Sequence, residues 1–190
     1  MTVSTPSNPT GSPGTEPEAV LVRTPTTDPI AVLDAASALP IRGPVLAVLA
    51  TASPERFERR LSEAGHDSGV ARVVDFVPRV DPTETTVPSD GGRIHGDVAG
   101  LSMELVGRLD GLTGEGDAVY LDSLEPLVSV AGLESTFRFL VIVAARARSA
   151  GVPLVARLDP GAVDSVAAGT LAEAFDRTVE GAAAEDGATE

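Results

Sequence analysis

The sequence contains no cysteine and no lysine among its 190 residues. The lack of cysteine excludes disulfide bonds, thiol catalysis and metal sites built from cysteine. The lack of lysine means that all 14 basic side chains are arginines, against 28 acidic residues. At this length the chain can fold as one domain with a substantial core, and it is too short for two full domains.

The excess of acidic residues gives a net charge of −14 at pH 7. We therefore expect no binding to nucleic acid or to an anionic membrane through bulk electrostatics. An acidic excess without lysine is typical of proteins from extreme halophiles, whose carboxylates hold water in concentrated salt. A GC-rich genome that replaces lysine by arginine is the alternative explanation, and composition leaves both open.

Long hydrophobic segments are also missing from the sequence. No apolar run approaches the length of a membrane span, and no basic N-terminal region precedes a hydrophobic stretch. We therefore expect a soluble, cytoplasmic protein. Residues 1–17 and 181–190 contain little apolar surface, which predicts a disordered leader and a disordered acidic tail around a single domain at residues 18–180.

Short apolar runs alternate with helical patterns between those two ends. Strands are predicted at residues 19–23, 45–50, 70–77, 118–121, 152–158 and 175–179, and a long loop at residues 78–92. Helices are predicted to begin at Pro29, Pro54 and Val98, with Asp28, Ser53 and Asp97 as N-caps, and to span residues 133–150 and 166–174. Runs without polar alternation suit strands buried on both faces of a parallel sheet. The predicted fold class is α/β, a three-layer, doubly wound and mainly parallel sheet.

The longest predicted helix, residues 133–150, connects two of the buried strands. Its expected buried face consists of Leu133, Phe137, Leu140, Ala144 and Ala147. Arg138 is expected on the opposite, solvent-facing side. Gly151 is expected to end this helix in the left-handed conformation.

Candidate functional side chains follow the predicted strands, because open α/β sheets bind ligands beyond the carboxyl ends of their strands. Asp122 and Ser123 come directly after the strand at residues 118–121. Nucleotidases use an aspartate in this position, with a neighbouring hydroxyl, to hold magnesium through water. The alternative is that Asp122 only caps the following turn through its own backbone.

Arginine and histidine side chains are the remaining candidates. Arg23, Arg42 and Arg157 could meet at the carboxyl edge of the sheet and hold an anion, or each could pair with an acidic neighbour. His66 and His95 lie in polar segments without an i,i+4 partner of the ligand type. We expect them to be surface residues rather than metal ligands or general bases.

Several of these stretches together resemble the core of RecA/KaiC-like ATPases. Residues 119–127, 137–140 and 151–155 are similar to its second half, and residues 45–57 to its second strand and helix. The chain also resembles a group of uncharacterised haloarchaeal RecA-like proteins, which agrees with its composition. The resemblance implies a RecA-like, P-loop-type core that assembles edge to edge, with Asp122 and Ser123 as a Walker-B-like remnant of a cofactor site.

The chain departs from that family at the positions of the family's phosphate-binding and catalytic residues. The family's phosphate loop is rich in glycine and ends in lysine and Ser/Thr, whereas residues 24–29 read Thr-Pro-Thr-Thr-Asp-Pro. Thr51 and Ala52 stand where the family has a paired glutamate that polarises water. We therefore expect a degenerate, RecA-like core without a P-loop, and no orthodox ATP hydrolysis.

Two functional hypotheses follow from this comparison. The preferred one is a non-catalytic RecA/KaiC-like domain without a cofactor, acting as a regulatory or protein-interaction module with a protein partner or as a homo-oligomer. The alternative is an unorthodox nucleotide- or phosphate-binding protein, or a weak ATPase, in which Asp122-bound magnesium and arginines would hold ATP.

Overall fold

A computed structural model of the chain describes residues 17–38, 42–66, 71–78, 93–96, 98–112 and 116–181. Nearly all of the predicted leader and tail lie outside the described residues. So do the Asp97 cap and most of the predicted loop at residues 78–92.

Within the described residues, seven strands form one sheet in which every neighbouring pair is parallel. The strands are β1 (Ala19–Arg23), β2 (Val45–Leu49), β3 (Ala71–Pro78), β4 (Arg93–Gly96), β5 (Ala118–Leu121), β6 (Leu154–Leu158) and β7 (Arg177–Glu180). Their order across the sheet is β4-β3-β2-β5-β6-β1-β7. The predicted α/β fold with a mainly parallel sheet is confirmed.

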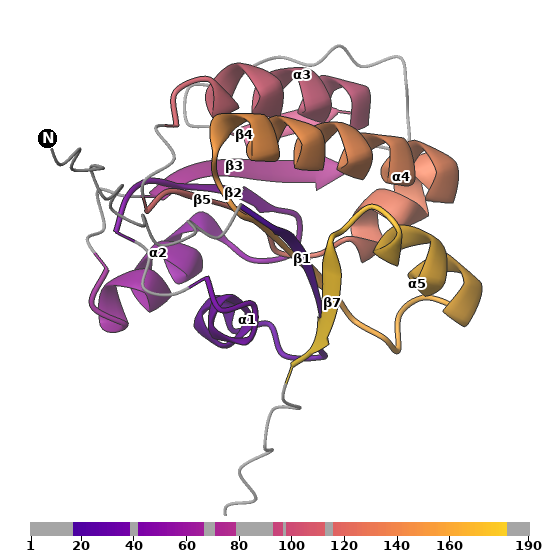
Figure 1. Cartoon of the computed structure of the whole chain (residues 1–190), viewed down its shortest axis with the longest axis horizontal. Coiled ribbons are helices and arrows are strands. Elements are labelled where there is room, and N and C mark those ends of the chain that lie inside the picture. Colours follow the sequence, from indigo (N-terminus) through magenta and orange to yellow (C-terminus); the bar gives the residue numbers. More distant parts are fainter. Residues whose placement is uncertain are drawn as a thin grey trace, which may run out of the picture.

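Helices cover both faces of this sheet (Figure 1). They are α1 (Pro29–Ala35), α2 (Pro54–Glu63), α3 (Val98–Leu109), α4 (Glu125–Ala150) and α5 (Ser165–Ala172). The first two lie on one face and the other three on the opposite face. From β1 to β3 the chain advances toward one edge of the sheet, and from β4 to β7 it advances toward the other. Opposite directions of travel use opposite faces when all crossovers have the same hand, so the sheet is doubly wound and has three layers.

Strand residues alternate between two apolar cores, one on each face of the sheet. On β2, Val45, Ala47 and Leu49 pack toward α1 and α2. Leu46 and Val48 pack toward the other three helices. Burial on both faces explains why the strands read as unbroken apolar runs in the sequence.

The two helices that begin with proline start as predicted. Asp28 Oδ1 accepts a hydrogen bond from the N–H of Ile30 at 3.2 Å. Ser53 Oγ accepts one from the N–H of Arg56 at 3.3 Å. These caps begin α1 and α2 just after β1 and β2, so both helix N-termini lie at the carboxyl edge of the sheet.

The longest helix differs from its prediction at its start. α4 begins at Glu125 and is kinked at Gly132, which has φ 78° and ψ 164°. This conformation is essentially restricted to glycine. The segment before the kink was missed because Pro126 and Gly132 interrupt the helical pattern. At the other end, Gly151 has φ 74°, as predicted.

The buried side of α4 was only partly predicted. Its core side chains are Leu127, Thr136, Phe139, Leu140, Val143, Ala144 and Ala147. Leu133 and Phe137, which were predicted to be buried, are only partly so, while Arg138 is exposed as expected. The error arose because the outer side of this helix also carries apolar residues, which blurs the amphipathic pattern.

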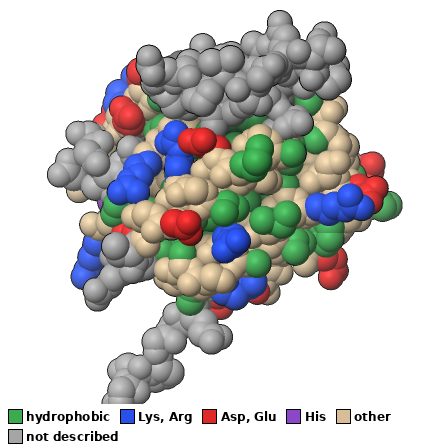
Figure 2. All heavy atoms as spheres, turned by 90° about the horizontal axis from the view of Figure 1, so that it is seen from above, with side chains coloured by type: hydrophobic (Ala, Val, Ile, Leu, Met, Phe, Trp, Pro, Cys, Tyr) green, Lys and Arg blue, Asp and Glu red, His purple; other side chains and the backbone are tan. Residues whose placement is uncertain are grey.

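Val141 and Ile142 are those outer apolar residues, and they are exposed. Figure 2 shows hydrophobic side chains among charged ones on the face formed by α3 and α4. By length and composition α4 could cross a membrane, which corrects the expectation that no such segment exists. Its other side packs on the sheet and on α3, so α4 is a core helix of an α/β domain.

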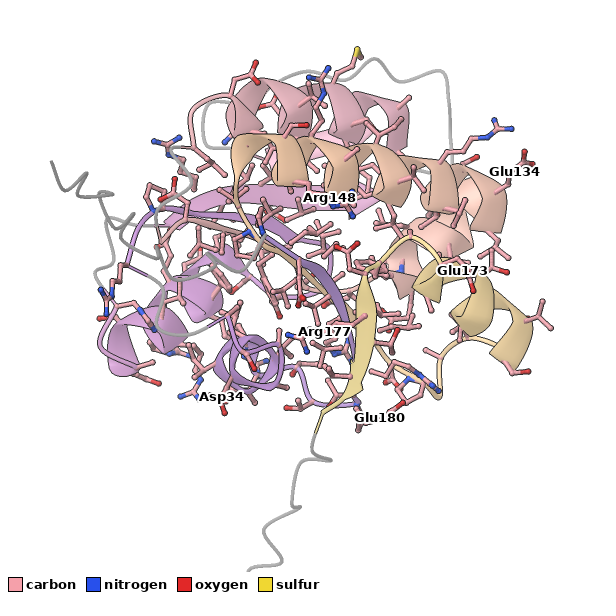
Figure 3. All side chains as sticks on the ribbon, viewed as in Figure 1. Asp34, Glu134, Arg148, Glu173, Arg177 and Glu180 are labelled. Atoms are coloured by element: carbon pink, nitrogen blue, oxygen red, sulfur yellow. The ribbon has the colours of Figure 1, made fainter. Side chains whose placement is uncertain are left out.

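The two edge strands are short. β4 was not predicted, because only Ile94 among its four residues is strongly apolar. β7 is held to the rest of the fold by side chains as well as by its pairing with β1. Arg177, labelled in Figure 3, contacts Glu18 through Nε at 2.7 Å and donates from Nη2 to the carbonyl of Ala36 at 2.6 Å. These contacts anchor the C-terminal edge of the sheet to the start of β1 and the end of α1.

Candidate functional site

Four strands end side by side at one edge of the sheet. β2, β5, β6 and β1 are consecutive in the sheet, and the loops after them lead to α2, α4, α5 and α1. β2 and β5 are neighbours whose following helices lie on opposite faces. Open α/β sheets bind ligands at such a point. The candidate site is therefore built from the loops after these four strands.

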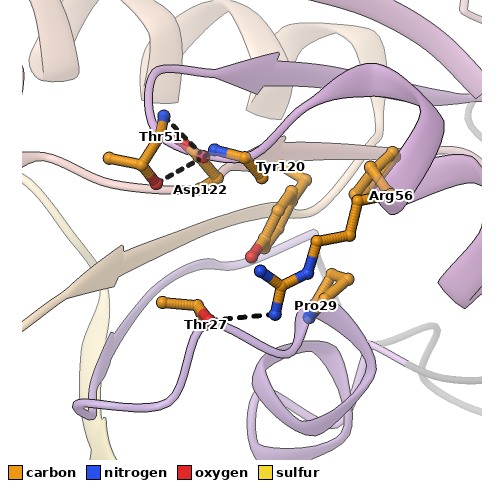
Figure 4. Close-up of a pocket in the computed structure, with 8 residues that line it drawn as sticks. Thr27, Pro29, Thr51, Arg56, Tyr120 and Asp122 are labelled. Carbon is orange, nitrogen blue, oxygen red and sulfur yellow. Dashed lines mark hydrogen bonds between the residues drawn. The ribbon is translucent and has the colours of Figure 1, made fainter.

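Asp122 lies directly after β5 and faces the loop after β2 (Figure 4). Its Oδ1 accepts a hydrogen bond from the N–H of Ala50 at 2.7 Å. Its Oδ2 accepts three: from the N–H of Thr51 at 3.0 Å, the hydroxyl of Thr51 at 2.8 Å and the N–H of Ala52 at 2.7 Å. Asp122 is only 5% exposed. Three successive amides of one loop thus converge on one carboxylate.

These contacts give Asp122 a structural task. Burial raises the pKa of the Asp122 carboxyl above its ordinary value, and the loop's hydrogen bonds act in the opposite direction. The half-buried N–H groups of this loop need acceptors, and the carboxylate supplies them from a neighbouring strand rather than capping its own turn. Sequence reasoning did not consider this arrangement.

The residues around Asp122 do not fit a magnesium ion. Both carboxylate oxygens already face loop donors. In the part of the chain that the structure describes, no three Asp, Glu or His side chains are grouped closely enough to hold a metal ion. Magnesium usually binds one or two carboxylates and several waters, and here the loop donors already engage both oxygens of the one carboxylate present.

Ser123 belongs to a different set of contacts. Its hydroxyl donates to Glu125 Oε2, and Glu125 Oε1 accepts the N–H of Asp159. Arg157 Nη1 lies 3.4 Å from Ser123 Oγ and 3.8 Å from Glu125 Oε1. The two predicted site residues are therefore adjacent in the chain but serve different neighbours. Ser123 ties the end of β5 to β6 and to the start of α4.

The side chain of Arg157, on β6, contacts the backbone of the loop after β1. It is 4% exposed. Its Nε donates to the carbonyl of Thr26 at 2.6 Å, and its Nη2 donates to the carbonyl of Pro25 at 3.2 Å. The loop that would have to offer amides to a phosphate instead offers carbonyl oxygens to a guanidinium.

Of the two alternatives for Arg23, Arg42 and Arg157, the one in which all three meet does not hold. Arg23 pairs with Glu180 at 3.1 Å, on the side of β7. Arg42 precedes β2 and so lies at the opposite edge of the sheet, where its N–H donates to the carbonyl of Gly116 at 3.1 Å. Only residues that follow a parallel strand reach its carboxyl edge, so Arg42 cannot take part in an anion site there.

A small pocket lies beside Asp122, between the ends of β2 and β5 (Figure 4). It is lined by Thr27, Pro29, Thr51, Ala52, Arg56, Phe57, Tyr120 and Asp122. Tyr120 stacks on Phe57 with ring centroids 5.5 Å apart. Burial raises the pKa of the Tyr120 hydroxyl far above its ordinary value, so the group stays protonated.

Neither Arg56 nor Tyr120 was predicted to be a site residue. The signal for Tyr120 is that its hydroxyl is the only polar side-chain atom in an otherwise apolar strand, Ala-Val-Tyr-Leu. Nothing in the sequence separates Arg56 from Arg59 and Arg60 of the same helix. Its position in the first turn of α2 becomes informative only when the strand order is known.

The two histidines lie away from this pocket. His66 follows α2, whose C-terminal end lies at the opposite edge from the site loops. His95 belongs to β4, the outermost strand on one side of the sheet. Their places give no reason to assign either of them a role in the candidate site.

A comparison with protein-family models finds a match over most of the chain. A model described as a family of unknown function, DUF7504, matches residues 18–181. The match begins one residue before β1 and ends one residue after β7, so it contains every described strand and helix. No curated protein matches the chain.

Proposed function

We propose that the chain, which belongs to the DUF7504 family, is a non-catalytic RecA/KaiC-like domain acting as a regulatory or protein-interaction module. One observation carries the proposal: the groups that would serve a nucleotide are bound inside the fold. The Asp122 carboxylate is taken up by the loop after β2, and Arg157 by the loop after β1.

The loop after β1 supports the same conclusion. Phosphoryl transfer needs donors around the phosphates, a metal ion and a group that orients water. Pro25 and Pro29 have no N–H to donate, and the Asp28 carboxylate lies between them in the chain. Asp28 already caps α1, so its carboxylate takes the helix N–H group that a phosphate would need there.

The arrangement of the sheet supports a role in assembly. Within the described residues β4 pairs only with β3, and β7 only with β1, so each presents an outer edge. Such edges can pair with another chain. We propose a protein partner or a homo-oligomer through these edges, in a cytoplasmic setting, without binding to nucleic acid or membrane through bulk charge.

A titration with magnesium and ATP in concentrated KCl tests this function. We expect no saturable binding below about 1 mM, which corresponds to about 4 kcal/mol of binding free energy, and no ATP turnover above background. Magnesium-dependent binding in the micromolar range that Asp122→Asn abolishes would contradict the proposal. It would favour the second candidate, a nucleotide-binding protein that uses Asp122 and arginines.

A further inference from the structure

The hydroxyl of Tyr120 has no hydrogen-bond partner in the described part of the chain. The residue is 1% exposed, so its ring is part of the core. Tyr120 nevertheless lines the pocket beside Asp122. The hydroxyl therefore opens onto that pocket. A hydroxyl in this position is free to pair with water or with a bound group that enters the pocket.

Arg56 is the second unused donor of the pocket. Arg56 is exposed, its guanidinium contacts Thr27 Oγ1 weakly from Nη2 at 3.5 Å, and its charge also attracts the Asp28 carboxylate. Figure 4 shows the Tyr120 hydroxyl pointing toward this guanidinium and the side chain of Thr27. The N-terminal end of α2, from which Arg56 comes, adds the partial positive charge of the helix dipole.

The acidic groups around the pocket already have donors. Asp122 is bound by four loop hydrogen bonds, and Asp28 is bound by Arg60 at 2.6 Å. The groups left with unused capacity at the pocket are the guanidinium of Arg56 and the hydroxyls of Tyr120 and Thr27. Because these groups can donate, they complement a ligand that only accepts hydrogen bonds, which is the property of an oxyanion.

The size of the pocket limits what can enter. It has room inside for a group about as large as one water molecule, and it opens to the surface. We propose that this pocket binds one oxyanion group, a phosphate or a carboxylate, which inserts an oxygen beside Tyr120 while Arg56 neutralises its charge. The site differs from a magnesium–nucleotide site because it uses no metal and leaves Asp122 bound to its loop, so it does not rest on the proposed function.

Tyr120 itself provides the measurement. It is the only tyrosine of the chain, and there is no tryptophan, so intrinsic fluorescence reports on this residue alone. The full chain is titrated with inorganic phosphate, and separately with formate, at constant ionic strength maintained with KCl. We expect a saturable change in fluorescence with at least one of the two anions, at concentrations on the order of millimolar. Saturation by phosphate alone identifies a tetrahedral group, and saturation by formate alone identifies a planar carboxylate.

Two arginines of the same helix separate a specific site from bulk attraction. Arg56→Gln should weaken the binding about tenfold, because it removes a charge-assisted donor. Arg59→Gln is the matched control. Arg59 is exposed, its Nε lies 3.8 Å from Glu63 Oε1, and it does not line the pocket. Its replacement should leave the anion concentration at half-saturation unchanged. Tyr120→Phe removes the fluorescent residue, so anion binding to this variant is measured by NMR through the Nε–H resonance of Arg56. We expect weaker anion binding in this variant as well.

Three results would overturn the proposal. They are the absence of a saturable response to either anion, an equal loss in Arg56→Gln and Arg59→Gln, and an unchanged response of Tyr120→Phe. The outcome is independent of the ATP titration. Micromolar binding of magnesium–ATP would reject the non-catalytic function, whereas the phosphate and formate titrations decide only whether this pocket takes an oxyanion.

Discussion

The carboxylate of Asp122 occupies the place that a bound anion would take at the amides of the loop after β2. Consecutive amides that point to one spot form an anion-binding concavity. Here Ala50, Thr51 and Ala52 provide those amides, and the anion comes from the end of β5. A residue that resembles a metal ligand in the sequence therefore acts as an internal ligand for the backbone.

Asp122→Asn tests this assignment directly. The amide keeps the shape of the side chain but places an NH₂ donor against a backbone donor, so at least one loop N–H loses its acceptor. We expect the free energy of unfolding to fall by about 1–3 kcal/mol in urea denaturation. Asp34→Asn, on the exposed side of α1, should stay within about 0.5 kcal/mol. If the two variants were equally stable, the loop would not depend on the Asp122 carboxylate.

A second prediction at the residue scale concerns Asp28 and the dependence of folding stability on pH. The hydrogen bond from Arg60 is the main reason that the pKa of Asp28 is lowered in the folded state. A lowered pKa stabilises the fold above the pKa of the unfolded chain, which is about 4 for an aspartate, and this stabilisation is lost as the pH falls through the folded value.

The matched variant for this test is Asp28→Asn, because asparagine is also a good N-cap and only the ion pair is lost. The difference in unfolding free energy between the native chain and Asp28→Asn should be constant above about pH 5 and should shrink below about pH 4. A difference that did not change over this range would mean that Arg60 does not stabilise the ionised form of Asp28.

At the level of elements, the sequence allowed the central strands and the helix starts to be predicted well. Buried parallel strands read as apolar runs, and an Asp-Pro or Ser-Pro pair has a local meaning that tertiary contacts rarely override. β4 was missed because an edge strand needs little apolar content. The first segment of α4 was missed because a proline and a glycine interrupt its helical sequence pattern.

Less of the candidate site could be predicted than of the fold. The position of Asp122 after a strand follows from the chain alone, but its partners do not. Ala50, Thr51 and Ala52 reach it only because β2 and β5 are neighbours in the sheet. The same order brings Arg56 and Tyr120 to one pocket. Strand order is set by long-range packing, which no local pattern encodes.

Two glycines with opposite expected behaviour test the kink of α4. A methyl group would have open space at both Gly132 and Gly107, so the difference lies in the backbone. Gly132 has φ 78°, which an alanine adopts only with strain, and Gly132→Ala should destabilise the fold by about 1–3 kcal/mol. Gly107 lies within α3, and Gly107→Ala should stabilise the fold by about 0.4–1 kcal/mol. Stabilisation by both substitutions in thermal or urea unfolding would mean that α4 can run straight through position 132.

At the scale of the whole molecule, two electrostatic effects respond to salt in opposite directions. Surface ion pairs, such as Arg138–Glu134 and Arg148–Asp176, weaken when salt screens them, but exposed pairs contribute only about 0–1 kcal/mol each. The net charge of −14 produces repulsion among carboxylates, and screening relieves it. Because the repulsion involves the whole surface, we expect its relief to be the larger effect.

The temperature of unfolding should therefore rise between about 0.1 M KCl, where charges interact over about 10 Å, and 1 M or more, where they interact over about 3 Å. Scanning calorimetry across this series measures it, with the reversibility of unfolding checked at each salt concentration. A rise that continues beyond 1 M, where simple screening is nearly complete, supports adaptation to concentrated salt, because only hydration of the carboxylates is left to change. A profile that rises and then levels off near 1 M reflects net charge alone. A flat or falling profile would contradict the halophilic interpretation and leave base composition as the explanation for the missing lysine.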